Sequence, residues 1–207
     1  MKYRLAIFDL DGTLADSFPW FLRIANSVAD KHGFRRIETH EIEALREKGS
    51  REIVRHFRVP MWRMPLIARD VRRMKAEAVD GISLFAGVDG MLEKLSAKGV
   101  VRAMVSSDSE DNVRRALGIN ARAISHFACG ASLFGKAKKF AKVMRFAGIP
   151  ASQTIAIGDE MRDAEAARKA GIDFGAVTWG YASVEALRQT RPALVFTHME
   201  EIAEKLG

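Results

Sequence analysis

The sequence predicts an α/β protein with a doubly wound parallel sheet and a small all-helical unit inserted after the first strand. The first strand is expected at 3–8, because this short apolar run is followed by a glycine turn. Residues 16–84 then show helical spacing without a convincing strand. From residue 85 onward, apolar runs alternate with helical patterns, which is typical of a parallel sheet covered on both faces. We therefore divide the chain into a core of residues 1–15 and 85–207 and a helical insertion of residues 16–84.

The insertion is expected to consist of helices alone. Residues 18–32 place apolar side chains on one side at helical spacing. Further helices are expected at 40–48, 51–57 and 64–79. Pro60 and Pro65 punctuate the gap before the last of these.

In the core, strands are expected at 100–105, 126–129, 154–157, 174–178 and 194–196. Helices are expected at 88–98, 110–117, 138–147, 162–170 and 184–189, and once more near the carboxyl terminus. The helix at 138–147 ends at Gly148-Ile149-Pro150, because glycine adopts the left-handed cap conformation and proline cannot continue a helix. Repeated strand–helix units of this kind favour a parallel sheet.

Composition and charge limit the classes of function. With 48% hydrophobic and 29% charged residues, the chain is typical of a soluble globular protein. Its net charge of +7 comes from scattered basic residues, and the clusters at 69–75 and 136–142 are interleaved with apolar residues at helical spacing. These clusters are typical of solvated helix faces, so we expect no nucleic-acid partner. A positive field does attract small anionic substrates.

The cysteine count and the amino terminus bear on the compartment. The single cysteine, Cys129, excludes an intramolecular disulfide and suits the reducing cytoplasm. The apolar stretch at 3–8 is too short for a signal peptide or a membrane span. We therefore expect a cytoplasmic protein without a membrane partner, and the sequence leaves its oligomeric state open.

Two aspartates after the first strand are the most informative residues. Asp9 and Asp11 are separated by one residue, and the alternation of a strand would project them from the same side at its carboxyl end. Ligands bind at that edge of open parallel sheets. Two neighbouring carboxylates repel each other, so they need a cation, a shared proton or distinct roles. A hard divalent cation fits best, and Mg²⁺ is the usual choice beside phosphate.

Other strand ends carry polar groups that could join this pair. Ser106 follows the strand at 100–105 directly and is a better functional candidate than Ser109, which is favoured as a helix N-cap. Asp159 and Asp163 follow the strand at 154–157, where two more acids would be costly without a cation. Three lysines, Lys136, Lys138 and Lys139, precede or enter a helix. The helix dipole disfavours cations there, which suggests that one of them faces the acidic cluster.

Together these residues resemble the motifs of the haloacid dehalogenase-like hydrolase superfamily, and of its phosphoglycolate phosphatase-like branch in particular. The first motif stands as Asp9-Leu10-Asp11-Gly12-Thr13, and the fourth as Gly158-Asp159-Glu160-Met161-Arg162-Asp163. Ser106 resembles the second motif. Lys136 resembles the third, although the family's common Lys-Pro is Lys136-Ala137 here. The resemblance covers nearly the whole chain and implies a Rossmann-like core with a helical cap.

The resemblance also implies a mechanism. Asp9 would attack phosphorus and become an aspartyl phosphate. Asp11 would protonate the leaving oxygen and then activate water. Ser106 and Lys136 would hold the phosphoryl oxygens and offset the charge of the transition state. The alternatives Lys138 and Lys139 remain open for the lysine.

The ligands of Mg²⁺ and the substrate contacts follow from the same resemblance. The ion would be held by Asp9, the backbone carbonyl of Asp11, and Asp159, with Asp163 as a supporting acid. Candidates for substrate binding are Gly12, Thr13 and Ser107 in the core, and Arg46, Lys48 and Gly49 in the cap. For these cap residues a solvated basic helix surface is an equally good interpretation.

We therefore expect a Mg²⁺-dependent phosphatase that hydrolyses a small phosphorylated metabolite. One alternative is a phosphomutase of the same branch, which passes the phosphoryl group to a sugar hydroxyl instead of water. Another is a catalytically inactive binding or regulatory protein. Retention of Asp9, Asp11 and Asp159 counts against the inactive protein, and the short cap counts against the mutase.

Overall fold

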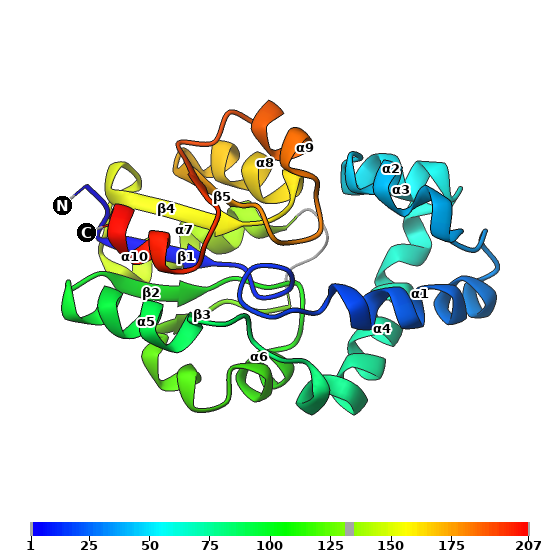
Figure 1. Cartoon of the computed structure of the whole chain (residues 1–207), viewed down its shortest axis with the longest axis horizontal. Coiled ribbons are helices and arrows are strands. Elements are labelled where there is room, and N and C mark those ends of the chain that lie inside the picture. Colours follow the sequence, from blue (N-terminus) through cyan, green and yellow to red (C-terminus); the bar gives the residue numbers. More distant parts are fainter. Residues whose placement is uncertain (1, 131–134, 207) are drawn as a thin grey trace.

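The computed structural model describes residues 2–130 and 135–206, and within them the chain forms one six-stranded parallel sheet (Figure 1). The strands are β1 (Leu5–Phe8), β2 (Val101–Met104), β3 (His126–Phe127), β4 (Thr154–Gly158), β5 (Asp173–Val177) and β6 (Leu194–Phe196). Their spatial order is β3-β2-β1-β4-β5-β6. This order confirms the predicted doubly wound, Rossmann-like α/β fold.

Strand β1 shows why the sheet is covered on both faces. Its four residues are all buried, and alternate side chains enter different cores. Phe8 and Ala6 belong to one hydrophobic cluster, whereas Leu5 and Ile7 belong to the other. A continuous apolar run is what a parallel strand buried on both faces requires.

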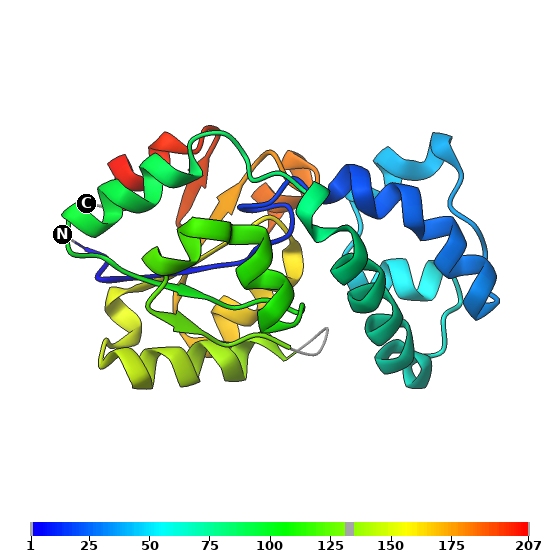
Figure 2. The ribbon, with the colours of Figure 1, turned by 90° about the horizontal axis from the view of Figure 1, so that it is seen from below.

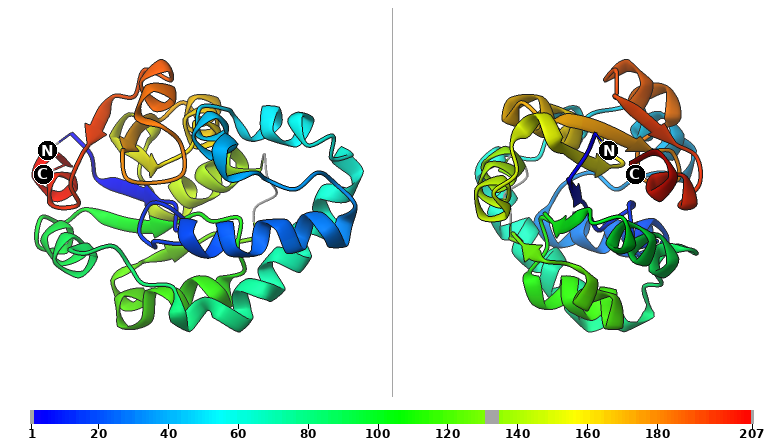
Figure 3. Two further views of the ribbon diagram at one scale, coloured as in Figure 1. Left: turned by 45° about the vertical axis from the view of Figure 1, so that its right-hand side comes forward. Right: turned by 90° about the vertical axis from the view of Figure 1, so that its left-hand side faces the viewer.

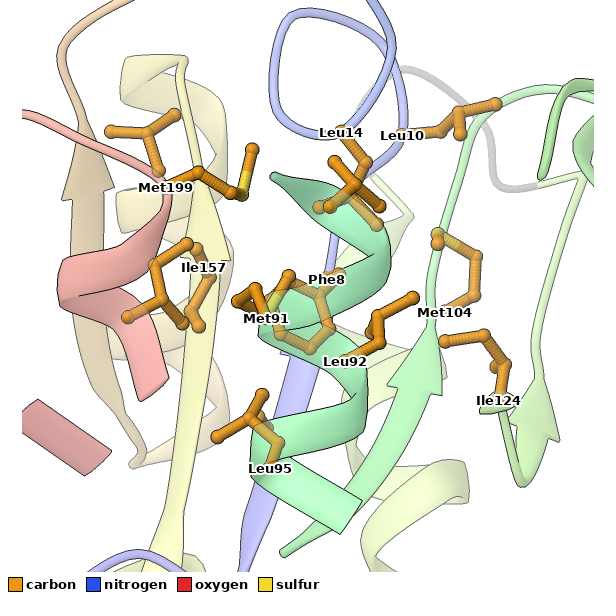
Figure 4. Close-up of a cluster of buried hydrophobic side chains, with 14 of the residues drawn as sticks. Phe8, Leu10, Leu14, Met91, Leu92, Leu95, Met104, Ile124, Ile157 and Met199 are labelled. Carbon is orange, nitrogen blue, oxygen red and sulfur yellow. The ribbon is translucent and has the colours of Figure 1, made fainter. Parts of the chain in front are cut away.

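The first core lies under α5 (Val88–Ala97), α6 (Glu110–Leu117) and α10 (Glu200–Leu206). In Figure 4, the α5 side chains Met91 and Leu95 lie over Phe8 of β1 and Ile157 of β4, and Met199 closes one side. The apolar stripe of α5 thus covers the centre of the sheet, where the two halves of the fold meet.

The opposite face is covered by α7 (Lys136–Ala147), α8 (Met161–Ala170) and α9 (Val184–Gln189). Phe140 and Val143 of α7 pack with Leu5 and Ile7 of β1 in this second cluster. The amino ends of α7 and α8 come together with the loop after β1, because Lys136 at the start of α7 contacts carboxylates in both places.

The remaining helices lie together beyond one end of the sheet (Figures 2 and 3). They are α1 (Phe18–His32), α2 (Ile42–Arg46), α3 (Ser50–His56) and α4 (Met64–Ala78). The longest two, α1 and α4, are tied by the buried pair His32–Asp70, whose Nε2 and Oδ2 atoms are 3.0 Å apart. None of the described helices is long and apolar enough to cross a membrane.

The chain enters and leaves this helical segment through two paired linkers. Ala15 and Leu84 form an antiparallel bridge. It is flanked by backbone hydrogen bonds of 2.9 Å from Asp16 N to Ser83 O and from Phe85 N to Leu14 O. The two linkers therefore lie side by side where they leave the core.

The expected elements are present, with differences at their ends. The expected helix at 40–48 is a 3₁₀ turn at Thr39–Glu41 followed by the short α2. The expected helix at 138–147 begins two residues earlier, at Lys136, because acidic side chains offset the unfavourable dipole at its first turn. Strand β3 has only two residues, and they pair with Ala103 and Met104 of β2.

Candidate active site

The candidate site lies where the strand order reverses. Strand β1 pairs with β2 on one side and with β4 on the other, all in parallel. Ligands in such sheets bind outside the carboxyl ends of the strands at this switch point. Asp9 follows the last residue of β1, and Asp159 follows the last residue of β4. The fold thus brings together two acids that are far apart in sequence.

Asp9 is held by one backbone hydrogen bond and one ion pair in a nearly closed environment. Its side chain is 5% exposed, its Oδ1 accepts a 2.8 Å hydrogen bond from Leu10 N, and its Oδ2 lies 2.6 Å from Lys136 Nζ. Burial raises the pKa of Asp9, and the Lys136 charge opposes that rise. The lysine therefore favours the ionised carboxylate that a nucleophile requires.

Among the three predicted lysines, geometry favours Lys136. Its Nζ also lies 2.5 Å from Asp163 Oδ1. Burial alone would lower the pKa of Lys136, but Asp163 and Asp9 raise it above the ordinary value, so the amine is charged. Lys138 is exposed, and Lys139 donates to the carbonyl oxygen of Cys129 over 3.0 Å.

Asp159 is fully buried and is positioned by the loop after β1 and the loop after β5. Its Oδ1 accepts from Thr13 Oγ1 and its Oδ2 from Tyr181 N, each over 2.8 Å. Gly12 has φ +74°, and a Cβ there would lie 2.2 Å from Asp159 Oδ2. A Cβ on Gly180 would lie 2.2 Å from Asp159 Cβ. Both glycines are required for this close approach.

Three carboxylates form the acidic cluster of the site. Asp9, Asp159 and Asp163 are all buried, and one oxygen of each lies within 4.8 Å of the others. Burial, followed by the charges of Glu160 and Asp9, raises the pKa of Asp159 well above its ordinary value. A hard divalent cation fits this donor set, because it would offset the repulsion that Lys136 balances only in part.

Asp11 has different partners from Asp9. Pairing of β1 ends at Phe8, and the chain turns at Leu10, whose carbonyl accepts from the backbone N–H groups of Leu14 and Ala15. The strand alternation used in the sequence argument therefore does not extend to Asp11. The Asp11 side chain joins Lys75 of α4, with Oδ1 and Nζ 2.5 Å apart. The ligand role expected for Asp11 involves its backbone carbonyl and stays a prediction.

Charge distinguishes the two aspartates further. Burial would raise the pKa of Asp11, but the charge and hydrogen bond of Lys75 lower it below the ordinary value. In the absence of substrate, Asp11 is therefore held as a carboxylate. It can accept a proton readily only when Lys75 shifts or a ligand changes the local charge.

The loop after β2 contributes hydroxyl and amide groups. Ser106 is fully buried, and its Oγ accepts a 3.0 Å hydrogen bond from Asp108 N. The Ser107 carbonyl accepts from Arg72 Nε of α4 over 2.8 Å. Ser109 caps α6, as predicted, by accepting a hydrogen bond from Asn112 N. Ser106 thus follows a strand, as the sequence predicts, and the structure shows that this strand, β2, pairs with β1.

The candidate cap residues lie against the core. Arg46 donates from Nε to Tyr181 O over 3.0 Å and from Nη2 to Gly180 O over 3.1 Å. A Cβ on Gly49 would lie 3.8 Å from Met161 Cε of α8, and Lys48 is half-buried. The Arg46 guanidinium therefore binds the loop that positions Asp159, and its expected role in substrate binding stays a prediction.

Sequence reasoning missed Lys75, Asp108 and Arg162. Lys75 was assigned to a solvated basic face, yet it is 3% exposed. One signal was available, since Lys75 follows Ile67 by eight residues and thus shares the inward stripe of α4. Arg162 pairs with Glu160 and lowers the pKa of Asp9, but only after the larger effects of burial and Lys136.

The family model described as haloacid dehalogenase-like hydrolase matches residues 6–177, which include all of these acids. The chain belongs to this family. A phosphoglycolate phosphatase of Synechococcus elongatus is 32% identical over 184 residues, covering 87% of this chain and 86% of that protein. The protein therefore falls in the phosphoglycolate phosphatase-like branch and is an enzyme of the phosphoric monoester hydrolase class.

One further relative and one solved structure are also similar to this chain. An N-acetylmuramic acid 6-phosphate phosphatase of Pseudomonas aeruginosa is 26% identical, over 89% of this chain and 86% of its own. A haloacid dehalogenase-like family hydrolase from Streptococcus pneumoniae has a TM-score of 0.78 at 18% identity, and 99% of each chain is covered. This structural likeness supports the fold, and the two named phosphatases differ in the ester that they are named for.

Proposed function

We propose that this enzyme is a Mg²⁺-dependent phosphatase that hydrolyses a small phosphorylated metabolite through an aspartyl phosphate. The observation that carries the proposal is Asp9 at the switch point, with Lys136 on one oxygen and the carboxylates of Asp159 and Asp163 nearby. This arrangement supports a nucleophile, a fixed positive charge and a cation site beside the carboxyl ends of β1 and β4.

The proposed cation ligands are carboxylates of Asp9 and Asp159 and the backbone carbonyl of Asp11, with Asp163 in support. When bound, Mg²⁺ would neutralise phosphoryl charge that these acids would otherwise repel. Asp163 accepts hydrogen bonds from Lys136 Nζ and, over 3.2 Å, from Glu160 N. Those two donors hold Asp163 in place beside the cluster.

The chain's own residues divide the chemistry between two steps. Asp11 first takes up a proton when the bound ester changes the local charge. In the first step, Asp9 Oδ then attacks phosphorus, the bond from phosphorus to the leaving oxygen breaks, and Asp11 gives its proton to that oxygen. In the second, Asp11 takes a proton from water, which attacks the aspartyl phosphate and frees Asp9. The Ser106 hydroxyl and the Lys136 ammonium bind the phosphoryl oxygens through both steps and stabilise the added charge.

We further propose that the helical segment of residues 16–84 acts as a cap over the core of residues 1–15 and 85–207. Contacts on both sides of the site support this function, since Arg46 binds the loop at Gly180 and Lys75 pairs with Asp11. A closed cap excludes water and limits the space for the ester.

The substrate class follows from the closed site and from the relatives. A buried nucleophile under a cap favours a small ester over a phosphoprotein or a nucleic-acid end, and the named relatives act on small phosphorylated acids. A single cysteine, with the pKa of its thiol raised by burial to about 12, is consistent with work in the cytoplasm.

A panel of phosphate esters tests the proposal. We expect Mg²⁺-dependent release of phosphate from small esters, loss of that activity in EDTA, and no turnover by Asp9→Asn with the fold retained. Full activity after exhaustive chelation would overturn the cation site. Transfer of the phosphoryl group to a second sugar hydroxyl, with little free phosphate, would favour the mutase instead.

A further inference from the structure

Arg162 brings a positive charge to the candidate site that neither the motifs nor the proposed chemistry uses. It lies in the first turn of α8, directly before Asp163, at a position that the fourth motif leaves open. Its side chain is 14% exposed, and its Nη2 atom forms an ion pair with Glu160 Oε1. Burial alone would lower the pKa of Arg162, but the charges of Glu160 and Asp163 raise it, so the guanidinium is protonated.

One donor of this guanidinium has no acceptor. Arg162 Nε is buried and makes no hydrogen bond, although three buried carboxylates belong to the same site. A guanidinium that served only as a counter-charge would direct its buried N–H groups at carboxylate oxygens, because an unsatisfied buried donor is costly. The Nε–H group therefore has capacity for an acceptor that arrives with a ligand.

Glu160 holds the guanidinium and links it to the helical segment. Its Oε1 pairs with Arg162, and its Oε2 accepts a 3.1 Å hydrogen bond from Ser50 Oγ at the start of α3. The backbone N–H of Glu160 also donates to Asp163 Oδ2 over 3.2 Å. Because both the side chain and the backbone of Glu160 are fixed, the guanidinium is held in place before a ligand binds.

The neighbours of Arg162 place it beside the reacting phosphorus. Asp9 must lie against phosphorus to attack it, and Lys136 Nζ joins Asp9 to Asp163, at 2.6 Å from Asp9 Oδ2 and 2.5 Å from Asp163 Oδ1. Arg162 directly precedes Asp163, and its charge acts on Asp9 after the larger effects of burial and Lys136. The guanidinium therefore borders the same space as Lys136.

A phosphoryl group supplies the kind of acceptor that this donor lacks. During transfer, negative charge spreads over its three equatorial oxygens, which gain from every donor fixed around them. A guanidinium presents its N–H groups in a planar fork that matches phosphate oxygens, whereas an ammonium acts as a point charge. Arg162 thus offers a contact that Lys136 cannot duplicate.

We propose that Arg162 is a further catalytic residue that binds a non-bridging oxygen of the phosphoryl group through its Nε–H group, beside Ser106 and Lys136. This inference rests on the proposed phosphatase function. Glu160 is the positioning residue that holds the guanidinium. Since the contact is with the transferred group, it does not depend on which alcohol leaves.

Inorganic phosphate tests the contact without turnover. In Mg²⁺, added phosphate should raise the Tm of wild type, because a ligand of the folded state stabilises it. We expect the apparent phosphate affinity to fall by about tenfold or more in Arg162→Gln, and by about threefold or more in Arg162→Lys, which keeps the charge but loses the fork. Arg168→Gln is the matched control, at an exposed arginine of the same helix, and should bind phosphate like wild type.

Kinetics distinguishes the transferred group from the rest of the substrate. We expect Arg162→Gln to lower kcat/KM by about 100-fold, the scale of one lost transition-state donor, on an alkyl and an aryl phosphate alike. A loss confined to one of the two esters would place the contact on the leaving group and overturn the inference. Glu160→Ala should lose part of the phosphate affinity, and Glu160→Gln, which can still accept a hydrogen bond, should restore much of it.

The outcomes separate this inference from the phosphatase function. Hydrolysis of no ester by wild type would refute the function, whereas weaker phosphate binding by Arg162→Gln would still support the contact. Wild-type phosphate affinity in Arg162→Gln would overturn the inference even in an active enzyme. Should Arg162→Gln fail to fold, Arg162→Lys decides, because wild-type affinity and kinetics in that variant would reduce Arg162 to a counter-charge.

Discussion

Asp9 and Asp11 lie two residues apart, yet each is paired with a different lysine from a different part of the chain. Asp9 contacts Lys136 of α7 on the core side, whereas Asp11 contacts Lys75 of α4. The pKa of Asp9 is raised by burial, and that of Asp11 is lowered by Lys75 in spite of burial. Neighbouring carboxylates with different environments can take the separate roles of nucleophile and acid–base group.

At this scale we expect Lys136→Ala to lower kcat/KM by about 100- to 1,000-fold, the scale of losing one transition-state donor. The physical reason is loss of the ammonium beside Asp9. Lys138→Ala is the control, because Lys138 is exposed, and it should be close to wild type. Steady-state kinetics on one small ester measures both variants. If kcat/KM fell sharply in Lys138→Ala but stayed near wild type in Lys136→Ala, then Lys138 would be the active-site lysine.

Asp11→Asn should separate esters by the basicity of their leaving groups. An alkyl ester needs a proton on its leaving oxygen, so we expect a loss of roughly 100- to 10,000-fold there. The leaving group of an aryl phosphate is a weakly basic phenolate, which needs no proton. The first step of its hydrolysis should therefore be affected far less. Burst kinetics on the aryl ester should then show slow hydrolysis of the aspartyl phosphate. Equal losses in the first step for both esters would contradict an acid role for Asp11.

At the scale of elements, two loops approach Asp159 so closely that each needs a glycine. Gly12 belongs to the loop after β1 and Gly180 to the loop after β5. A Cβ added at either glycine would overlap the Asp159 side chain. Thr13 and Tyr181, the neighbours of these glycines, supply the two hydrogen bonds to that carboxylate. In each loop, the glycine is followed directly by the residue that donates the hydrogen bond to Asp159.

Gly180→Ala should therefore destabilise the protein by about 2 kcal/mol or more, since a Cβ would lie 2.2 Å from Asp159 Cβ. It should also weaken Mg²⁺ binding by displacing the carboxylate. Gly90→Ala is the matched control. No heavy atom lies within 4 Å of its added Cβ, and inside α5 alanine should stabilise by roughly 0.5–1 kcal/mol. Urea unfolding and metal titration of both variants measure these effects.

The sequence was sufficient for most elements and for the residues at strand ends. Apolar runs and glycine or proline stops placed the sheet, and parallel strands bring their carboxyl ends together, which predicted the proximity of Asp9 and Asp159. The packing of α4 on the core was not predictable in the same way. It depends on contacts such as Arg72 with the Ser107 carbonyl, which no local pattern encodes. The stripe of α4 could show that Lys75 faces inward, but not that it would meet Asp11.

At the scale of the whole molecule, the buried acids link stability to pH and to the cation. A carboxyl whose pKa is raised in the folded state binds its proton more tightly there than in the unfolded chain. Its contribution to folding is therefore present at low pH and is lost as the pH rises from the ordinary value of 3.8 through the raised pKa of Asp159. A bound cation would remove this penalty.

In EDTA, we therefore expect the Tm of Asp159→Asn relative to wild type to increase between pH 5 and pH 8. Acids far from this cluster titrate alike in both proteins, so the difference reports on Asp159 together with the neighbouring acids whose charges act on it. Mg²⁺ should raise the Tm of wild type at pH 8 and leave Asp159→Asn nearly unchanged. Thermal unfolding at several pH values measures both effects, and a difference that is constant with pH would contradict the linkage.

The paired linkers of the helical segment have a consequence for how such a molecule can change over evolutionary time. Because Ala15 and Leu84 are bridged, the helical segment is a long insertion whose two ends lie next to each other at the core. The free-energy cost of closing such an insertion as a loop grows only with the logarithm of its length, by about 0.6 kcal/mol for each doubling. Helices can then be gained, lost or exchanged between these points while β1 and β2 keep their register. Changes in the helical segment can thus alter the substrate range, while the acidic cluster of the core stays unchanged.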